Sequence, residues 1–397
     1  MTTTNNNEHK KLNVPNIRFP EFSGEWEEST IGEEFDLYSG NTPSRLNKEH
    51  FNGAINWISS GELKEHYIAD TKEKISDEAA KNLKMLPIGT FVIAIYGLEA
   101  DGVRGTGSIT KSESTISQAC MAFTTKGKVQ NEFLYSWYKK HGNIIGIRYA
   151  QGTKQQNLSY DIIEKFKIAY PAFQEQEKLN KFIALLDERI AIQSKIIEEL
   201  KKLKCAIIEK LYSKIQGKEY SFGQLFEVVN ERNKQMKYSN ILSASQEKGM
   251  VNRDDINLDI QFERSNINTY KIVRAGDYVI HLRSFQGGFA FSDKLGVCSP
   301  AYTILRPKEV LEYGYLSYFF MSRQFIKSLI LVTYGIRDGR SINVEEWLGM
   351  KTKLPSKKEQ RKILNVLCCF DEKIQNEENM LNKLSKQKQY LLRQMFI

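Results

Sequence analysis

A segment of about forty residues occurs twice in this chain. The stretch PAFQEQEKLNKFIALLDERI begins at Pro171 and PSKKEQRKILNVLCCFDEKI begins at Pro355. The second copy aligns with the first at a constant offset of 184 residues, without a gap, to the end of the sequence, and ten positions are identical. A repeat of this kind predicts one structural unit that occurs twice.

Apolar residues in both copies recur every three or four positions, which is the heptad spacing of a helix with one apolar face. We predict two helices of about 33 residues, or roughly 50 Å each. Polar residues interrupt both patterns at matching places, with Gln193 and Lys204 in the first copy and Glu377 and Lys388 in the second. The predicted seam consists of Leu179, Ile183, Leu186, Ile190, Ile197, Leu200, Ile363, Leu367, Phe370, Ile374, Leu381 and Leu384.

Helices this long and one-sided need a partner in water. Only residues 213–218 separate the first helix from the next strand-like stretch, so a second globular part begins at the far end of that helix. If this part leads into the second helix as the first part leads into the first, the two helices run in opposite directions. We therefore predict an antiparallel coiled coil. The alternative is that each helix lies only on its own globular part.

The same order of signals precedes each helix. PIGTFVIAIYG corresponds to RAGDYVIHLRS, and SQACMAFTT corresponds to SPAYTILRP; all are turn-then-strand patterns with β-branched and aromatic residues. A helical stretch, a polar loop and a last strand follow in both halves, as NEFLYSWYKKHG and QGTKQQNLS in the first half and YGYLSYFFMSRQFIKS and GIRDGRSIN in the second. Each globular part is expected to be mixed α/β, mostly sheet.

The predicted fold class is therefore α/β: two mixed, mostly sheet domains joined by two long helices, with an internal pseudo-two-fold repeat. The expected divisions are an N-terminal tail (1–25), a first domain (26–170), a long helix (171–216), a second domain (217–354) and a second long helix (355–397). The globular parts have diverged more than the helices. This pattern is typical of a constant structural frame that carries two domains with different recognition properties.

Composition narrows the class further. The net charge of +9 favours a polyanionic partner. The polar N-terminus lacks an apolar signal segment, so we expect a cytoplasmic protein. The five cysteines show no metal-ligand spacing. We expect the adjacent pair Cys368 and Cys369 to be small core residues of the second helix rather than a redox site.

Catalytic motifs are absent from the sequence. There is no Pro-Pro dipeptide of the kind that amino-methyltransferases use, no phosphate-binding loop and no Pro-Asp nuclease motif. None of the five histidines has a catalytic or metal-binding partner at a recognisable spacing, and His281 at a strand end is expected to be a surface or contact residue. We predict a chain that binds and does not catalyse, with no metal of its own.

Side chains that suit DNA gather in equivalent loops of the two halves. Arginine pairs with guanine, glutamine with adenine, and serine, threonine and lysine with either bases or phosphates. A solvated loop has a similar composition, so the recurrence in both halves carries the argument. The candidates are Tyr96, Arg104, Gln151, Thr153, Lys154, Gln155 and Gln156 in the first half, and Arg283, Ser284, Gln286, Tyr334, Arg337 and Arg340 in the second.

Taken together, these stretches resemble the specificity subunit of type I restriction-modification systems. The resemblance covers nearly the whole chain, from PNIRFPEFSGEWEESTIGE through NWISSGEL and QGTKQQNLSYDIIEKFKIAYP to the P-x-x-x-E-Q start of both helices. It implies two target recognition domains, each reading one half of a bipartite DNA site, with helix length setting the spacer between the halves.

The resemblance also implies partners. Two modification subunits would bind S-adenosylmethionine and methylate adenine, and restriction subunits would use ATP and Mg²⁺, so that this chain itself binds no cofactor. The loop GIRDGRSIN departs from the pattern because it lacks the Gly-Thr of QGTKQQNLS. The alternative function is a two-headed coiled-coil scaffold that binds proteins; binding that does not weaken with salt would favour it.

Overall fold

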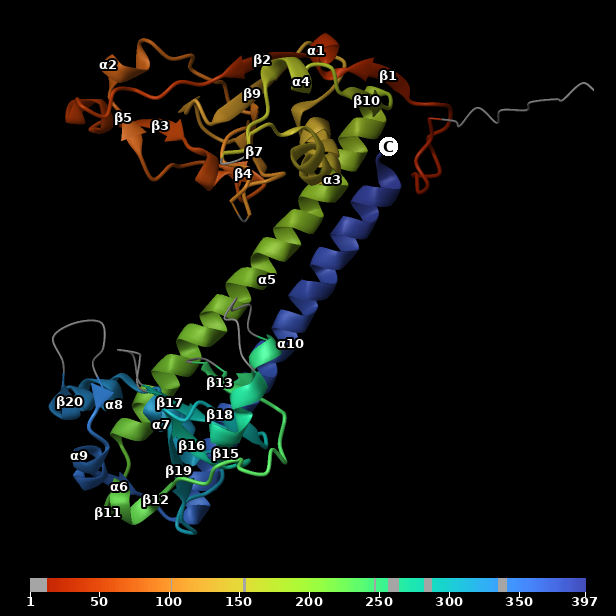
Figure 1. Cartoon of the computed structure of the whole chain (residues 1–397). Coiled ribbons are helices and arrows are strands. Elements are labelled where there is room, and N and C mark those ends of the chain that lie inside the picture. Colours follow the sequence, from red (N-terminus) through yellow and green to blue (C-terminus); the bar gives the residue numbers. More distant parts are fainter. Residues whose placement is uncertain are drawn as a thin grey trace, which may run out of the picture. The chain divides into compact units, whose positions relative to one another are not determined.

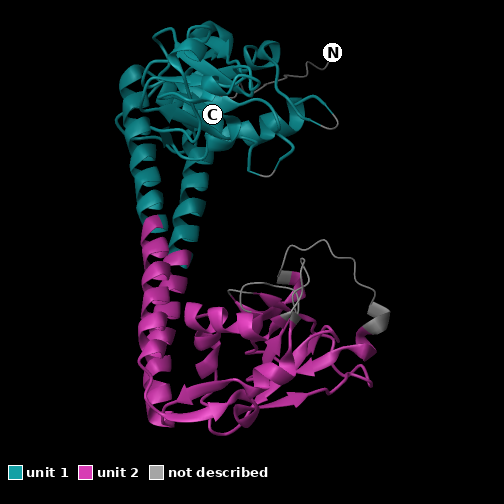
Figure 2. Ribbon diagram, turned by 90° about the vertical axis from the view of Figure 1, so that its left-hand side faces the viewer, with its two compact units in different colours: residues 1–194, 379–397 teal, residues 195–378 magenta. Residues whose placement is uncertain are grey.

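The computed structural model describes residues 13–100, 102–152, 155–245, 248–255, 264–281, 288–334 and 341–397. The chain contains two long helices, α5 (Phe173–Ser213) and α10 (Lys357–Met395), and two sheet-rich globular parts (Figure 1). The chain divides into two compact units, residues 1–194 with 379–397 (unit 1) and residues 195–378 (unit 2) (Figure 2). Each unit therefore contains one globular part and a portion of both long helices, whereas the sequence led us to treat the helices as separate segments.

Unit 1 is built around a five-stranded sheet in the order β2-β9-β6-β7-β4. Neighbouring strands are antiparallel except β4 and β7. A three-stranded sheet has the order β5-β3-β8, and β1 pairs with β10. The strands are β1 (Glu27–Thr30), β2 (Phe35–Ser39), β3 (Ile55–Ile58), β4 (Tyr67–Ile68), β5 (Lys74–Ile75), β6 (Phe91–Ala94), β7 (Gly107–Thr110), β8 (Ser114–Ile116), β9 (Cys120–Thr125) and β10 (Lys167–Tyr170). The helices are α1 (Ile31–Glu34), η1 (Lys48–Phe51), η2 (Ser60–Glu62), α2 (Asp77–Ala80), α3 (Asn131–Tyr149) and α4 (Tyr160–Ile163).

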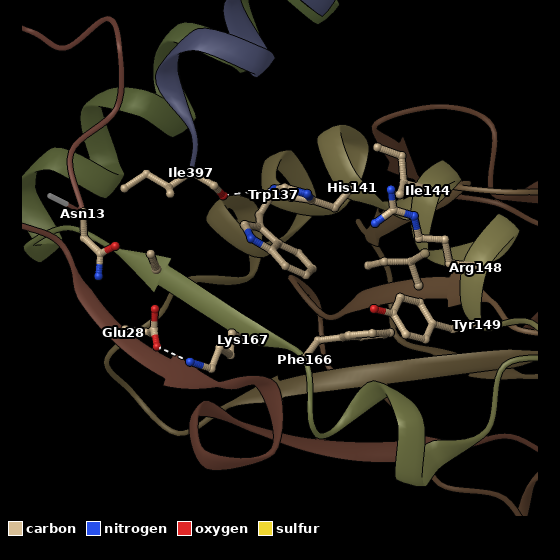
Figure 3. A pocket seen from close by; sticks show the side chains of 12 residues that line it. Asn13, Glu28, Trp137, His141, Ile144, Arg148, Tyr149, Phe166, Lys167 and Ile397 are labelled. Atoms are coloured by element: carbon tan, nitrogen blue, oxygen red, sulfur yellow. Dashed lines mark hydrogen bonds and ion pairs between the residues drawn. The ribbon is translucent and has the colours of Figure 1, made fainter. Parts of the chain in front are cut away.

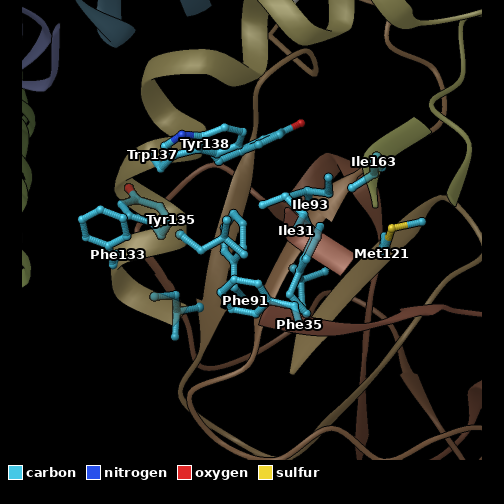
Figure 4. Packing of buried hydrophobic residues seen from close by; sticks show 14 of the residues in the cluster. Ile31, Phe35, Phe91, Ile93, Met121, Phe133, Tyr135, Trp137, Tyr138 and Ile163 are labelled. Atoms are coloured by element: carbon cyan, nitrogen blue, oxygen red, sulfur yellow. The ribbon is translucent and has the colours of Figure 1, made fainter. Parts of the chain in front are cut away.

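The core of unit 1 lies between the central strands and α3 (Figure 4). Every residue of β6 is buried, because the strand is central and both of its faces are covered. Phe91 of β6 packs edge-on against Tyr135 and Tyr138 of α3. Aromatic side chains remove large apolar areas from water, so this layer fixes α3 on the sheet.

Unit 2 repeats this plan with different side chains. Its antiparallel sheet has the order β12-β19-β16-β17, and β11 pairs with β22 as β1 pairs with β10. The strands are β11 (Lys218–Ser221), β12 (Phe226–Val229), β13 (Leu242–Ser245), β14 (Gly249–Asn252), β15 (Lys271–Val273), β16 (Tyr278–Ile280), β17 (Phe289–Phe291), β18 (Gly296–Cys298), β19 (Thr303–Pro307), β20 (Thr333–Tyr334), β21 (Ser341–Ile342) and β22 (Lys351–Leu354). The helices are α6 (Phe222–Leu225), η3 (Arg253–Asp255), η4 (Arg264–Thr269), α7 (Tyr315–Phe320), α8 (Arg323–Ser328), η5 (Leu329–Val332) and α9 (Val344–Gly349).

Local sequence fixes the same turn at the start of both units. Thr30 and Glu33 form a capping box at α1, and Ser221 and Gln224 form one at α6. In each case two backbone N–H groups are satisfied by side chains, which ends the first strand and starts a single helical turn. The predicted mixed α/β fold with two long helices is confirmed.

The long helices are antiparallel within each unit. In unit 2, Lys204 pairs with Asp371 and Lys201 with Glu378, so the residue number on α10 rises as that on α5 falls. In unit 1, Lys388 pairs with Asp187, while Met395 and Phe396 at the end of α10 share a core with Leu179 near the start of α5. The twelve residues of the predicted seam are all buried or half-buried; Ile183 and Leu367 are completely buried.

Two of the polar interruptions in the seam find partners. Lys388 in unit 1 and Lys204 in unit 2 are equivalent in the repeat, and so are their partners Asp187 and Asp371. The Lys388 and Asp187 side chains are only 14% and 16% exposed. A largely buried charge is tolerated only where its partner is in place, so each pair favours one register of the two helices over shifted ones.

The Glu-Gln pair at the start of each long helix has a structural role that the sequence did not reveal. The Gln176 amide donates to the carbonyls of Lys128 and Pro171 (both 2.9 Å) and accepts from the backbone of Gln130 (2.9 Å). In unit 2, Gln360 makes the same three bonds, to Val310, Pro355 and Glu312 at 2.8–3.1 Å. Both side chains are completely buried.

The Glu of this pair differs between the units. Glu175 is buried and accepts two hydrogen bonds from Arg18, at 2.8 and 2.6 Å, whereas Glu359 is exposed and pairs with Lys362. Arg18 belongs to residues 13–25, which lie against the long helices in unit 1: Phe19 contacts Phe182 edge-on and Lys178 pairs with Glu21. The described part of the predicted 1–25 tail is thus packed on unit 1.

A charged and aromatic cluster joins β4 to the long helices in unit 1. The His66 ring is stacked with Tyr135 and lies 3.1 Å from the Asp187 carboxylate, which also pairs with Lys388. Burial lowers the pKa of the neighbouring Lys139 to about 8, and the positive charge of Lys388 acts in the same direction. His66 thus has a carboxylate partner distant in sequence, which spacing alone did not identify.

The prediction for the cysteine pair was wrong. Cys368 and Cys369 are both exposed, because Leu367 occupies the buried position of this helical turn and the next two residues project away from the seam. Cys368 lies 3.8 Å from the hydroxyl of Tyr318, and Cys205 of α5 is also exposed. Burial raises the pKa of Cys120 and Cys298 to about 12, so those two thiols are protonated at neutral pH.

Replacing Gln176 with methionine keeps the volume but removes three hydrogen bonds to buried or part-buried backbone groups. We expect Gln176→Met to lower the free energy of unfolding by about 3 kcal/mol, because unsatisfied buried groups cost about 1–3 kcal/mol each. Gln174→Met, at an exposed position in the same turn, is the matched control and should change stability by less than about 0.5 kcal/mol. Equal effects in urea unfolding would contradict the assigned role.

Lys139 predicts a dependence of stability on pH. Its folded pKa of about 8 lies below the ordinary 10.5, so between these values the unfolded chain binds the proton better and stability rises with pH. Below pH 8 the fold carries the full cost of the buried charge. Lys139→Met should therefore melt at a higher temperature than the parent at pH 7, and the difference should shrink towards pH 10. Lys165→Met, at an exposed position, should show no such trend.

Candidate nucleic-acid interface

The two candidate loops of unit 1 lie against each other. The first follows β6 and includes Tyr96 and Arg104; the second joins α3 to α4 and includes Gln151, Gln155 and Gln156. The backbone of Leu98 donates to the carbonyl of Gln156 (3.0 Å). The second loop closes on itself, because Gln151 and Asn157 exchange both backbone hydrogen bonds, at 2.8 and 2.9 Å. The fold thus brings together residues more than fifty positions apart.

Gln156 anchors this arrangement. The Glu99 carboxylate accepts from its backbone N–H (2.8 Å), and the Arg104 guanidinium donates to its side-chain oxygen (2.9 Å). The hydrogen bond from Gln156 and the nearby charge of Arg104 lower the pKa of Glu99. Glu99 is therefore ionised at neutral pH and holds the two loops together.

Glycines make the close packing possible. Gly152 has φ +112°, and a Cβ there would lie 2.0 Å from the carbonyl oxygen of Gln155, so no other residue fits this turn. Gly146 on α3 leaves space for Arg104, whose Cγ would be 2.4 Å from an added Cβ. Arg104 therefore lies along the helix surface, with its head turned to Gln156.

The structure separates the unit 1 candidates into two groups. Tyr96, Gln151 and Gln155 are exposed at the loop surface and are free to meet a ligand. Arg104 and Gln156 are half-buried and bonded to each other, so in this structure they link the two loops. Sequence spacing could not show this pairing, since 52 residues separate the two. Thr153 and Lys154 lie outside the described residues.

In unit 2 the bases of the two corresponding loops also meet. The ends of β16 and β17 are joined where His281 donates its backbone N–H to Gly288 (2.8 Å). A Cβ on Gly288 would lie 3.1 Å from Ile342 of β21, and β20 and β21 pair at the base of the second loop. Tyr334 is the last residue of β20, and its side chain is not among those described. Arg283, Ser284, Gln286, Arg337 and Arg340 lie outside the described residues.

Neither a metal centre nor a membrane segment emerges from the described part of the chain. Within those ranges, no three histidine, cysteine or acidic side chains come close enough together to hold a metal ion. None of the described helices combines the length and apolar character that crossing a bilayer requires. His281 is half-buried, and burial lowers the pKa of its ring.

Comparison with known proteins shows which proteins the chain is similar to. Residues 23–202 match the family described as the type I restriction modification DNA specificity domain. The specificity subunit of the type I restriction enzyme MjaIX from Methanocaldococcus jannaschii is 26% identical over 185 residues, 45% of this chain and 42% of that protein. The MjaVIII specificity subunit from the same organism is 23% identical over 95% of this chain and 92% of its own length.

Solved structures share the fold. The S subunit of a type I restriction-modification system from M. genitalium is 15% identical, covers 97% of this chain and 99% of its own, and has a TM-score of 0.56. A second chain, from a study of complex assembly and conformational transition in the type I system, is 13% identical with 92% and 96% coverage and a TM-score of 0.58. The matched domain and the shared fold agree with the resemblance to type I specificity subunits that the sequence showed.

The role of the loop pair is tested by Gly152→Ala. The added methyl group clashes with backbone and demands a strained φ, so the loop that carries Gln151 and Gln155 must change shape. We expect DNA binding to weaken at least about ten-fold in fluorescence anisotropy, with little change in the melting temperature, because the loop is at the surface. Gly61→Ala, where a Cβ meets open space at ordinary φ, should bind as the parent does. Unchanged binding by Gly152→Ala would separate this loop from DNA recognition.

Proposed function

We propose that this chain is the DNA-recognition subunit of a type I restriction-modification complex. Each unit reads one half of a bipartite double-stranded DNA site, and the long helices set the spacer between the halves. Two modification subunits methylate adenine at the site, and restriction subunits cut unmethylated DNA. The family match of residues 23–202 and the likeness along nearly the whole chain support this function.

The observation that carries the proposal is the combination of a repeated frame with unlike loops. In both units the ends of two loops lie close together. In both units the same buried glutamine also connects the globular part to a long helix. The loop sequences themselves, QGTKQQNLS and GIRDGRSIN, differ. Recognition of two different half-sites requires a common frame with different loops. Base contacts from the loops specify the sequence, whereas the frame only positions those contacts.

The exposed chemistry of unit 1 suits the major groove. The Gln151 and Gln155 amides present both a donor and an acceptor, the pair that matches N6 and N7 of adenine, and Tyr96 adds a flat surface. The net charge of +9 supplies the non-specific attraction to phosphates that all such proteins use.

The chain itself is proposed to be non-catalytic. S-adenosylmethionine, ATP and Mg²⁺ would bind to the partner subunits. Support comes from the sequence, which contains none of the methyltransferase, ATPase or nuclease motifs named above.

Methylome sequencing of host cells with and without the gene for this chain tests the proposal. We expect deletion to remove N6-methyladenine from one bipartite motif and from no other. Restoring the gene should restore the methylation, whereas the purified chain alone should methylate and cut no DNA. Persistence of every methylated motif after deletion, while the modification subunits are still expressed, would contradict the proposed function.

A further inference from the structure

Each unit carries an exposed aliphatic side chain immediately before one of its candidate loops. In unit 1 it is Ile147, in the last turn of α3, which is 61% exposed. In unit 2 it is Leu331 of η5, which is 75% exposed. The loops follow within four residues, at Gln151 and after Tyr334. Single exposed aliphatic residues are common on protein surfaces, so the position of these two has to carry the argument.

The two side chains occupy equivalent positions of the repeat. The offset of 184 residues also relates the segments just before the long helices, because β10 corresponds to β22 and Ser159 before α4 corresponds to Asn343 before α9. The same offset relates Ile147 to Leu331. An exposed aliphatic residue at one matched position of two otherwise diverged domains favours a shared use.

The backbone that carries Leu331 is held in place from the buried side. Leu329 and Val332 are buried in the core of unit 2. The Thr333 hydroxyl donates to the carbonyl of Leu329 (2.5 Å), and the backbone N–H of Asn343 donates to the carbonyl of Val332 (2.8 Å). Leu331 is therefore held outward on a fixed turn, so a contact with a ligand costs little conformational entropy.

In unit 1 the last part of α3 holds Ile147 beside the two candidate loops. Ile145 is buried, and Gly146 lies against the side chain of Arg104 from the first loop. Arg104 in turn donates to Gln156 of the second loop. Ile147 thus directly follows the residue at which the loops lie against the helix.

A cation accompanies the aliphatic side chain in both units. The exposed Arg148 follows Ile147 and, with Ile144, lines a separate cavity of about 310 Å³ that Ile147 itself does not line (Figure 3). The exposed Lys327 lies four residues before Leu331, in the last turn of α8. A positive charge next to an apolar group suits DNA, because phosphates flank the base edges in the grooves.

We propose that Ile147 and Leu331 are base-contacting residues and that each recognises the methyl group of a thymine in its half-site. The C5-methyl of thymine is the apolar group that base pairs display in the major groove, and apolar side chains contact it there. In unit 1 this contact complements the exposed amides of Gln151 and Gln155, which suit the polar edge of adenine. Every methylated adenine pairs with a thymine, so a methylated site contains this ligand. The inference rests on the proposed function and names a chemical group that the two units recognise.

The test removes the methyl group from the DNA and the aliphatic side chain from the protein. The probe is a fluorescent duplex with the bipartite motif found by methylome sequencing, and two further duplexes carry deoxyuridine in place of the thymines of one half. The variants are Ile147→Ala and Leu331→Ala. The controls are Ile88→Ala and Leu295→Ala, which are also exposed but lie before β6 and after β17, at the strand ends away from the loops.

Fluorescence anisotropy at one salt concentration should show that the parent binds either deoxyuridine duplex about four-fold more weakly, as expected for the loss of one buried methyl group. Leu331→Ala should bind the unmodified motif about ten-fold more weakly and lose nothing further when deoxyuridine replaces thymine in one half. Ile147→Ala should show the same insensitivity for the other half. Both controls should match the parent with all three duplexes. The five proteins should melt at closely similar temperatures, because every altered position is exposed.

Variants that respond to deoxyuridine in both halves as the parent does would overturn the methyl contact. Variants that bind DNA normally but no longer bind the modification subunit in gel filtration would also overturn it, because the two side chains would then contact a protein. A parent chain that prefers the motif to a scrambled duplex yet ignores deoxyuridine would overturn this inference alone. A parent chain without preference for the motif would instead contradict the proposed function.

Discussion

In each unit, a single buried carboxamide joins the globular part to its long helix. Gln176 and Gln360 each satisfy two carbonyls and one N–H in buried or part-buried surroundings. Such hydrogen bonds add little net free energy of folding, because water offers the same bonds to the unfolded chain. Leaving a buried group without a partner costs more, so these bonds favour one geometry over others. The direction in which the helix leaves the sheet is fixed by this contact.

The charged pairs in the seam fix the register of the two long helices. Lys388 pairs with Asp187 and Lys204 with Asp371, so these two lysine interruptions each lie opposite a carboxylate of the other helix. An apolar seam alone tolerates sliding by a heptad, whereas a slipped helix would leave these lysines buried without a counter-ion. The frame is thereby held constant, and the loops are free to vary on it without changing the position from which they act.

The sequence predicted the parts of the structure that depend on local periodicity. The repeat and its heptads identified both long helices, and the turn-then-strand signals found the central strands, because a pattern of apolar spacing reports directly on which face is buried. The helix lengths were underestimated, since α5 and α10 span 41 and 39 residues. The single helical stretch expected around Tyr315 to Ser328 is two helices, because Ser322 caps the second.

What the sequence did not reveal were contacts between distant residues. Arg104 and Gln156 both have the chemistry of a base reader, and only the fold shows that they bind each other. Cys368 and Cys369 fit an apolar pattern by type but not by phase, so they are exposed. Gln176 looked like one identity among ten, and its importance depends on three backbone groups that converge around it.

The most direct test of this account exchanges residues 217–354 for the matching segment of a relative with a different methylation motif, followed by methylome sequencing. If the long helices form a constant frame and each unit recognises its half-site independently, one half of the bipartite motif should change. The other half and the spacer length should stay the same. A change in both halves, or a new spacer length, would show that recognition is shared between the units and that the frame does not separate them.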